Sequence, residues 1–537
     1  MKKKRIKIIS VIAAVAVIAA SLCVAGIALT IHDGLFSTNT PMYITPNGSV
    51  KGNVENEEDY EAFMLDITEP GALTVMLEHE NLIDNTNAYD IKVYKILQGE
   101  ENQYHEIEFF QSFWNAVTAS WGEVGVSPGT YCIVVTSGTK LLRCEFNLIT
   151  SFNKTSGFEE EPNDTRETAN TLNAGKAKYA GSPKKTEGTD VDWYTFKLTK
   201  DSCVELLFNH EDQALPSAGW NIKLMDSEEK IICNLTSKLQ DTETTSGILG
   251  LRAGTYYVRV ESQSEVSKSY TVLLSKRAAG NCEFELNDTP ETATLLPCDT
   301  EISGALAEKL LSLDKDYYKF VVPEAGSVDF EFRHNPLEGD HDGWNIRLYK
   351  KNADGTLTSV VTKIAPWNTR GINIYNLGLA AGEYYALIDA DGRMYTSEGY
   401  TCKWSLMPSS CFEKEPNNTR KTAENIKFNT IYHGAVISND LGSVYDTDYF
   451  RFELTQQDNV SLELGHDKIF DSAVPWHISI VDEDNFVLYE LESSLNQGLI
   501  TTGAVSLPEG TYYVKITTGT NSSDIPYFFK LSGVERD

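Results

Sequence analysis

The sequence of 537 residues predicts an all-β protein, with four tandem antiparallel β-sandwich domains that follow one N-terminal transmembrane helix. Three observations predict this fold class. A domain-sized pattern recurs along the chain, its apolar residues alternate with polar ones at the period of a β-strand, and helical periodicity is nearly confined to one apolar stretch near the N-terminus. Hydrophobic residues make up 41% of the chain, which is enough to build several cores.

The first element is the N-terminal apolar segment. A basic cytoplasmic tip, 1–7, precedes residues 8–31, which carry no charge. At ~1.5 Å per residue, a helix of this length reaches ~36 Å and can cross a bilayer. Because basic residues stay on the cytoplasmic side, such a signal-anchor places the rest of the chain outside the cell. A cleaved signal peptide is the alternative interpretation, and it exports the chain as well.

The charge of the chain restricts its partners. The formal net charge is −31, so the phosphates of a nucleic acid would repel the protein, and we expect no nucleic-acid partner. The same surface attracts cations. Eight of the nine cysteines lie beyond the apolar segment, where an oxidising compartment permits disulfides, but the sequence predicts no particular pairing.

Four repeats follow the apolar segment. A Gly-Thr-Tyr or Gly-Glu-Tyr motif begins at Gly129, Gly254, Gly382 and Gly510, and alternating apolar residues follow it each time. Such alternation is typical of a strand with one buried face, and short strands separated by Gly, Asn and Asp turns indicate an antiparallel sandwich. The predicted domains are 41–150 (a divergent first repeat), 157–277, 281–408 and 411–537.

A second strand of each repeat ends in a histidine. His79, His210, His334 and His466 share the parity of the apolar residues before them, as in Val204-x-Leu206-x-Phe208-x-His210. Residues of one parity point to one face of a strand. We therefore expect these histidines to be buried and hydrogen-bonded in a structural role.

Acidic residues open three of the four repeats, and an acid-x-acid pair follows 25–30 residues later in each. Several carboxylates brought together with an amide oxygen repel one another unless a hard cation lies among them, and calcium accepts 6–8 such oxygens. Zinc would need His or Cys ligands, which these segments do not cluster. The alternative is that the acids cap turns and solvate an edge. The acidic segments are 159–165, 283–289 and 413–419, and the later pairs are Asp190/Asp192, Asp314/Asp316 and Asp446/Asp448.

The order of these motifs resembles a known family. The pattern Glu-x-Glu-Pro-Asn-Asp-Thr, then Asp-x-Asp-x-Tyr, then Gly-Thr-Tyr-Tyr is similar to that of the bacterial pre-peptidase C-terminal domain, a family that includes the collagen-binding domains of clostridial collagenases. The resemblance is strong over about 155–537 and weaker over 41–150. It implies a jelly-roll sandwich, with calcium between the acidic arm and the Asp-containing loop.

The resemblance also implies a ligand set for each repeat. In the first repeat only Glu57 and Asp59 precede the aromatic strand, so a site there is doubtful, and the fourth repeat has Asn418 where the others have an acid. The implied calcium ligands are Glu159, Glu161, Asn163 and Asp164 with Asp190 or Asp192; Glu283, Glu285, Asn287 and Asp288 with Asp314 or Asp316; and Glu413, Glu415 and Asn417 with Asp446 or Asp448.

The expected function is binding without catalysis. The sequence contains no zinc-protease helix motif, nucleophile elbow, phosphate loop or dinucleotide fingerprint, so we expect neither enzymatic activity nor catalytic residues. The preferred hypothesis is a cell-surface binding or adhesion protein, anchored in the membrane or secreted, whose ligand is an extracellular protein or polysaccharide. The alternative is an accessory or structural subunit of an envelope protease or another secreted-enzyme complex.

Overall fold

The computed structural model describes residues 41–533, except for 56–58, 82–84, 98–103, 139–144, 182–184, 187–188, 214–215, 264–268, 310–312, 340, 391–397, 438, 441–445, 468–475, 495 and 519–525. The predicted transmembrane segment, 8–31, lies outside the described residues. Among the residues that are described, no helix is both long and apolar enough to cross a membrane. The only helical element in that part of the chain is a short 3₁₀ turn, η1 (Arg166–Thr168).

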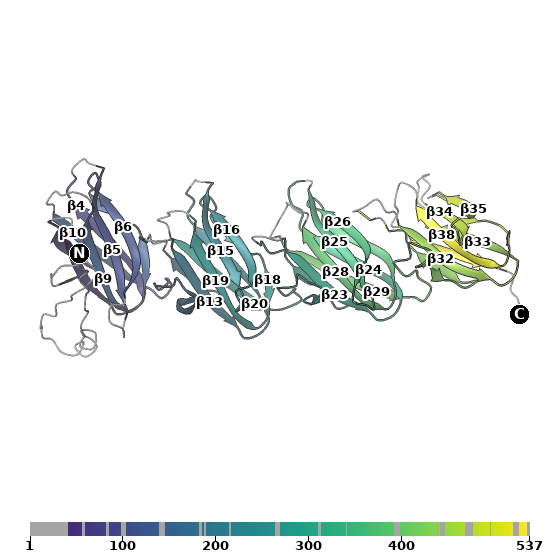
Figure 1. Ribbon diagram of the computed structural model, residues 1–537, viewed down its shortest axis with the longest axis horizontal. Coiled ribbons are helices and arrows are strands. Elements are labelled where there is room, and N and C mark those ends of the chain that lie inside the picture. Colours follow the sequence, from purple (N-terminus) through teal and green to yellow (C-terminus); the bar gives the residue numbers. More distant parts are fainter. Residues whose placement is uncertain are drawn as a thin grey trace, which may run out of the picture. The chain divides into compact units, whose positions relative to one another are not determined.

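The described chain forms two compact units, of which the first holds strands of the first two repeats and the second holds those of the last two together with a short segment of the second repeat. Figure 1 labels the strands. The first unit runs to Ser246 and includes Ala253–Ala278, and the second comprises Gly247–Arg252 and everything from Ala279 onward. The strands of the first repeat are β1 (Met42–Tyr43), β2 (Gly48–Asn53), β3 (Tyr60–Ile67), β4 (Gly71–His79), β5 (Asn87–Ile96), β6 (Tyr104–Phe113), β7 (Thr118–Ala119), β8 (Glu123–Val126), β9 (Gly129–Ser137) and β10 (Glu145–Lys154).

The later repeats have strands of the same kinds in the same sequence order. Those of the second are β11 (Asn170–Thr171), β12 (Ala177–Ala180), β13 (Val191–Leu198), β14 (Ser202–His210), β15 (Ala218–Met225), β16 (Ile231–Lys238), β17 (Glu243–Thr245), β18 (Leu249–Leu251), β19 (Gly254–Ser262) and β20 (Tyr270–Ala278). Those of the third are β21 (Thr294–Leu295), β22 (Ile302–Gly304), β23 (Lys315–Val322), β24 (Gly326–His334), β25 (Asp342–Lys351), β26 (Leu357–Pro366), β27 (Gly371–Leu379), β28 (Gly382–Ala390) and β29 (Tyr400–Pro408). Those of the fourth are β30 (Glu424–Asn425), β31 (Ile431–Gly434), β32 (Thr447–Leu454), β33 (Asp458–His466), β34 (Trp476–Asp482), β35 (Val487–Ser493), β36 (Leu499–Thr501), β37 (Val505–Leu507), β38 (Gly510–Thr518) and β39 (Tyr527–Ser532).

Two sheets arise from each repeat, and their strand orders match. In the first repeat one sheet has the order β1-β3-β9-β5-β6 and the other β2-β10-β4-β7, with β8 also along β4. The third repeat gives β21-β23-β28-β25-β26 and β22-β29-β24-β27. Here the single strand β27 replaces the pair β7 and β8, with a register shift between Val328 and Phe330 of its partner strand. The first strand of each five-stranded order runs parallel to the second, and the other pairings between these strands are antiparallel.

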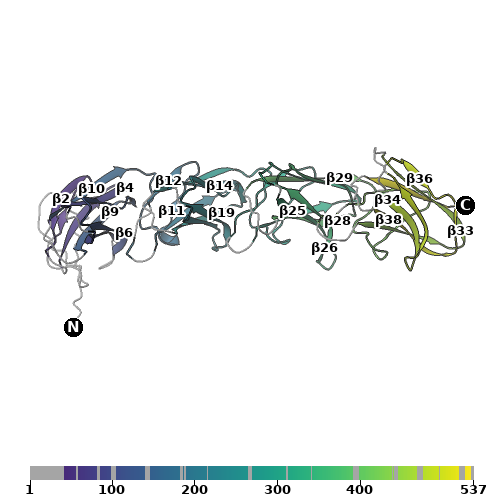
Figure 2. The same cartoon turned by 90° about the horizontal axis from the view of Figure 1, so that it is seen from above.

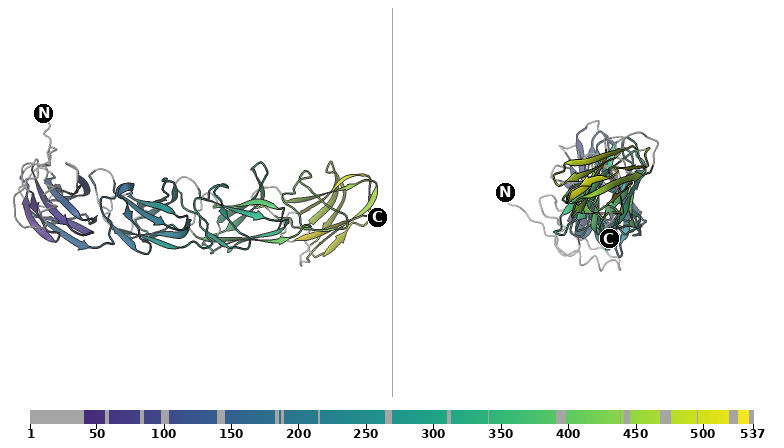
Figure 3. Two further views of the ribbon diagram at one scale, coloured as in Figure 1. Left: turned by 90° about the horizontal axis from the view of Figure 1, so that it is seen from below. Right: turned by 90° about the vertical axis from the view of Figure 1, so that its right-hand side faces the viewer.

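The two sheets of a repeat lie face to face (Figures 2 and 3). Buried apolar side chains from both sheets form the hydrophobic clusters of the first, third and fourth repeats. In the first repeat, the alternate residues Leu73, Val75 and Leu77 of β4 pack in the same buried cluster as Ile91 of β5 and Ile133 of β9. Burying a Leu or Ile side chain of this kind stabilises the fold by about 1.5–3 kcal/mol. The prediction of an all-β chain with sandwich-forming sheets is therefore confirmed.

The histidine at the end of one strand of each repeat has the predicted buried, structural role. The Nε2 atoms of His79, His210 and His466 lie 2.5, 3.1 and 2.9 Å from the hydroxyl groups of serines on the neighbouring strand. Those serines are Ser112, Ser237 and Ser493. In the third repeat Ala365 occupies this register position opposite Trp344, and the Nε2 atom of His334 has no hydrogen-bond partner. In three of the four repeats the histidine thus joins two neighbouring strands in the core.

The cysteines differ in their oxidation state. Cys203 and Cys282 are each disulfide-bonded, whereas Cys132, Cys298, Cys402 and Cys411 are free thiols. Burial raises the pKa of the Cys132 thiol to about 12, so this free cysteine is an unreactive apolar side chain of the core.

One buried carboxyl group lies in the first repeat, where sequence reasoning did not expect one. Glu108 on β6 is 1% exposed, and its Oε2 atom has no hydrogen-bond partner. Burial raises the pKa of Glu108 to about 8. Because the folded state favours the protonated form, its stabilising effect is complete below the unfolded pKa of about 4.5 and is lost as the pH rises toward 8.

Replacing Glu108 tests this burial cost. At pH 7 the carboxyl group costs the first repeat about 3 kcal/mol, because its pKa lies well above the unfolded value. We expect Glu108→Gln to slow hydrogen exchange of the β6 and β9 amides strongly at pH 7 and only slightly at pH 5. The exposed Glu145→Gln serves as the control and should change exchange at neither pH. Equal protection of wild type and Glu108→Gln at pH 7 would show that the buried carboxyl group does not destabilise the first repeat.

Candidate metal centre

Each candidate centre is built on an extended acidic arm at the start of a repeat. In the second repeat the Glu159 amide donates to the Tyr179 carbonyl at 2.7 Å, and the Tyr179 amide donates to the Gly157 carbonyl at 2.7 Å, so the arm runs along β12 as an added strand. Alternate residues of an extended segment point to the same side. Glu159, Glu161 and Asn163 therefore face inward and are 0% exposed, whereas the residues between them are partly exposed.

The inward-facing carboxylates meet the second aspartate of the acid-x-acid pair. In the second repeat these residues are Glu159, Glu161 and Asp192, and one oxygen of each lies within 4.8 Å of the others. Oxygens that share a calcium ion at 2.3–2.6 Å are at most about 5 Å apart, so the spacing suits calcium. The same arrangement recurs in the third and fourth repeats, as Glu283, Glu285 and Asp316, and as Glu413, Glu415 and Asp448.

Each centre leaves equivalent oxygen atoms without a hydrogen-bond partner. In the second repeat these atoms are Glu161 Oε1, Asn163 Oδ1 and Asp192 Oδ1. Buried oxygens without a partner are costly, and a native site with several of them needs an explanation. The donor set consists only of carboxylate and amide oxygens, which are the ligands that calcium prefers. The matching unpartnered atoms are Glu285 Oε1 and Oε2, Asn287 Oδ1 and Asp316 Oδ1 in the third repeat, and Glu415 Oε1, Asn417 Oδ1 and Asp448 Oδ1 in the fourth.

The remaining oxygens are held by fixed donors. In the third repeat the Ala305 amide donates to Glu283 Oε1 at 2.7 Å, and the Tyr318 hydroxyl donates to Glu283 Oε2 at 2.8 Å. The Tyr400 hydroxyl donates to Asp316 Oδ2 at 2.5 Å. These donors come from the body of the sandwich, so the core orients the carboxylates before any ligand arrives. Tyr270 and Tyr527 donate to Asp192 and Asp448 in the same way.

The electrostatics of the clusters favour either protons or a cation. Burial, followed by repulsion from neighbouring carboxylates, holds the pKa values of Glu159, Asp192 and Glu415 well above their usual range. Burial also raises the pKa of Glu283 to about 7. A bound divalent cation would favour the charged forms, and these carboxylates would then release protons on binding.

A lysine holds the other predicted aspartates in the second and third repeats. Lys185 forms ion pairs with Asp164 of the arm and with Asp190 of the loop, the latter at 3.1 Å. Lys309 pairs in the same way with Asp288 at 2.6 Å and Asp314 at 2.5 Å. Burial alone would raise the pKa of Asp164, but hydrogen bonds from His105 and the charge of Lys185 lower it below its usual range. The lysine therefore ties the arm to the body without a metal.

The fourth repeat lacks this ion pair. Asn418 replaces the arm aspartate, and Asn439 stands at the position of the lysine, 26 residues after the first arm glutamate as in the other two repeats. Asp446 instead accepts hydrogen bonds from the amides of Ile437 and Thr447, at 2.8 and 3.1 Å. An acid and a base have been exchanged together, so the formal net charge of the group is −4 in all three repeats.

The structure thus divides the predicted residues into two groups. The arm glutamates and asparagines and the second aspartates, Asp192, Asp316 and Asp448, come together in the clusters. Asp164, Asp190, Asp288 and Asp314 lie at the lysines instead. The sequence analysis did not identify the lysines or the donating tyrosines, although the constant spacing from arm glutamate to lysine was a usable signal.

No acidic cluster of this kind is found among the described residues of the first repeat. Glu57 lies outside the described residues. Asp59 accepts hydrogen bonds from the amides of Glu55 and Tyr60, at 3.1 and 3.0 Å, and so caps a turn.

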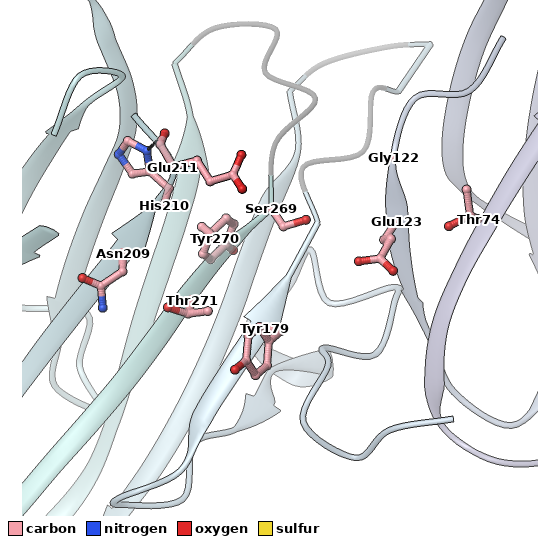
Figure 4. A pocket seen from close by; sticks show the side chains of 10 residues that line it. All are labelled: Thr74, Gly122, Glu123, Tyr179, Asn209, His210, Glu211, Ser269, Tyr270 and Thr271. Carbon is pink, nitrogen blue, oxygen red and sulfur yellow. Dashed lines mark hydrogen bonds between the residues drawn. The ribbon is translucent and has the colours of Figure 1, made fainter. Parts of the chain in front are cut away.

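A separate hollow of about 600 Å³ lies within the first unit (Figure 4). It is lined by Thr74 and Glu123 of the first repeat and by residues of β12, β14 and β20 of the second, including Tyr179. Tyr179 is 51% exposed, so its ring is open to a ligand. The lining also includes the carboxylates of Glu123 and Glu211, and an aromatic ring with polar groups nearby is a surface that sugars or peptides can contact.

Comparisons with known proteins match the sequence to no family model and to no curated protein. Solved structures resemble it only distantly. The pre-peptidase C-terminal domain of a collagenase from Bacillus anthracis is 12% identical, with 21% of this chain and 94% of that chain covered and a TM-score of 0.17. The N-terminal CBM22-1–CBM22-2 tandem domain of Xyn10C from Paenibacillus barcinonensis is 9% identical over 41% of this chain and 83% of that chain, with a TM-score of 0.15. The CUB1-EGF-CUB2 domain of human MASP-1/3 is 7% identical over 43% and 99%, with a TM-score of 0.15.

The lysine bridge gives a test that needs no metal. Lys185→Gln leaves Asp190 a buried acid without its cation, whereas Asp164 keeps its contact with His105. Breaking a buried ion pair costs about 3–5 kcal/mol. We expect hydrogen exchange of the Val191–Trp193 amides to accelerate at least tenfold in the presence of a chelator. Lys176→Gln, at an exposed position of the same repeat, should have no effect. Unchanged exchange in Lys185→Gln would show that the bridge does not hold the arm.

Proposed function

We propose that the chain is a non-catalytic, extracytoplasmic binding or adhesion protein, built of four sandwich modules of the pre-peptidase C-terminal type. Calcium holds the arm to the body in the second, third and fourth modules. The ligand is an extracellular protein or polysaccharide, and the N-terminal segment 8–31 tethers the modules to the membrane or directs their secretion.

One observation carries this proposal. Three times in the chain, a buried Glu-x-Glu-x-Asn arm and an aspartate offer oxygen atoms of the same kinds that have no hydrogen-bond partner. A solvated acidic edge, the alternative interpretation, would place these groups in water, whereas Glu159, Glu161 and Asn163 are 0% exposed. A hard cation at this place satisfies the oxygens and offsets the charge.

Two further features support a location outside the cytoplasm. The apolar residues 8–31 behind a basic tip are typical of an export signal or anchor. Cys203 and Cys282 are disulfide-bonded, and structural disulfides persist chiefly in oxidising compartments.

Calcium binding is tested by stoichiometry. Equilibrium dialysis of residues 41–537 should give about three calcium ions per chain, with dissociation constants near the ~10⁻⁴–10⁻³ M of extracellular calcium modules. At ~2 mM calcium and a dissociation constant of ~10⁻⁴ M, each ion stabilises its module by about 1.8 kcal/mol. Glu161→Gln combined with Asp192→Asn removes one cluster, and we expect it to lower the stoichiometry by one ion.

The first repeat supplies the control for this measurement. Asp59→Asn changes an acid that caps a turn, so the stoichiometry should not change. A stoichiometry that is the same for wild type and the cluster variant, or that falls in Asp59→Asn, would contradict the proposed sites.

Ligand binding is tested separately with the exported region. Residues 41–537 immobilised in ~2 mM calcium should retain one component from a panel of collagen, cell-wall glycans and native envelope extract, and release it in a chelator. Retention of only an envelope enzyme would favour the accessory-subunit alternative. Turnover of a protein, peptide, ester or glycan substrate that one point mutation abolishes would contradict a non-catalytic role.

A further inference from the structure

Each acidic arm also contacts the strand that precedes it in the chain. In the first unit, the Glu161 amide donates to the Gly125 carbonyl at 3.0 Å, and Val126 and Glu161 form a parallel bridge. In the second unit, the Glu415 amide donates to the Gly378 carbonyl at 2.8 Å, and Leu379 and Glu415 form the equivalent bridge. The arm therefore pairs as a strand on both of its edges. One edge pairs with a strand of its own repeat, and the other pairs with the end of β8 or β27 of the preceding repeat.

The contact requires that the accepting residue have no side chain. A Cβ atom added at Gly125 would lie closer than 3.0 Å to the carbonyl oxygen of Glu159, and one at Gly378 would lie equally close to that of Glu413. Real Cβ atoms do not approach a backbone oxygen so closely. Neither Gly125 nor Gly378 has a positive φ, so backbone conformation alone does not explain why glycine occupies these positions. The close approach of the arm backbone therefore requires a residue without a side chain at these two positions.

The same position can be identified in every repeat from the sequence. It lies four residues before the Gly-Thr-Tyr or Gly-Glu-Tyr motif, and it is Gly125, Gly250, Gly378 and Ser506 in turn. In the second unit, the Glu285 amide donates to the Gly250 carbonyl at 2.8 Å, so three of the four positions accept an arm. Strand register supports the equivalence, because each position described by a strand pairing lies opposite the residue that precedes a core residue of the neighbouring strand. The pairs are Gly125 with Ala72 before Leu73, Gly378 with Ser327 before Val328, and Ser506 with Asn459 before Val460.

Ser506 departs from the pattern. It lies on β37, its side chain is exposed, and its Oγ atom accepts a hydrogen bond from Gln457 Nε2 at 3.1 Å. The Cβ and hydroxyl of Ser506 take the space that the carbonyl of an arm glutamate occupies beside Gly125 and Gly378. We propose that this position decides whether a repeat receives a Glu-x-Glu arm, and that Ser506 closes the fourth repeat to one.

We call a position of this kind open when it is occupied by glycine. The contacts define which segment can dock at an open position. It is an extended acidic segment with two glutamates. The amide of the second glutamate donates to the glycine carbonyl, and the carbonyl oxygen of the first occupies the space where a side chain at the glycine position would lie. Both contacts are made by backbone atoms, so they do not depend on a cation in the arm. A fifth repeat, or the arm of a second copy of this chain, finds the matching strand in β37 blocked by one side chain.

The loss of an open position is tested in the full chain. Gly378→Ser should displace the arm of the fourth repeat and raise the rate of limited proteolysis at 408–412 at least tenfold, with and without calcium. Gly399→Ser is the matched control, because a Cβ there meets only the Gly304 carbonyl at 3.6 Å, an ordinary contact. Equal cleavage rates in the two variants would overturn the proposal. Faster cleavage of Gly378→Ser in a chain that binds no calcium would support this proposal while contradicting the proposed metal centre.

The gain of an open position is tested by extension. A second copy of residues 409–537 is joined to the end of the full chain, with either Ser506 or Ser506→Gly before it. We expect the new linker to be cleaved at least tenfold more slowly in the Ser506→Gly chain, because the appended arm can then dock. Equal cleavage of both linkers, when the appended repeat shows the same melting transition in both chains, would show that Ser506 does not close the strand.

Discussion

The placement of negative charge in a dry interior is the constraint on which the rest of each arm-bearing repeat depends. Glu159, Glu161 and Asp192 are buried within 4.8 Å of one another, and burial of unpaired carboxylates costs several kcal/mol each. Three features of the sandwich offset this cost. Tyrosine and backbone donors hold one set of oxygens, a lysine pairs the outer aspartates, and the remaining oxygens point to a common place where a cation fits.

The first repeat shows what the fold looks like without this constraint. Its strand order is that of the others, and its core is built on the same alternation, yet no acidic cluster occurs among its described residues. The sandwich therefore does not need the arm in order to fold. The arm is an additional strand that joins a repeat to the repeat before it. Burying its carboxylates costs free energy, and the arm that carries them provides this connection.

Much of the architecture could be predicted because it depends on local periodicity. The alternation in Val204-x-Leu206-x-Phe208-x-His210 is visible in the sequence and becomes β14, with the histidine buried. The Glu-x-Glu-x-Asn spacing places its three side chains on one face of an extended segment, where all three are buried. The ion pairs of Asp190 and Asp164 could not be predicted, because their partner Lys185 comes from a loop whose path the sequence does not reveal. Gly125 was missed for a related reason, since the close approach of another backbone leaves no trace in periodicity.

The paired exchange of Asp164 and Lys185 for Asn418 and Asn439 has a consequence for the stability of the single replacements between them. Two single replacements separate the two arrangements, and the intermediate depends on their order. A repeat that keeps the lysine but has asparagine in the arm still pairs that lysine with the loop aspartate. A repeat that keeps both aspartates without the lysine buries an additional uncompensated charge beside the cluster. The single replacement that keeps the lysine is therefore the milder one, so the lysine and the loop aspartate form a stable pair even with an asparagine in the arm.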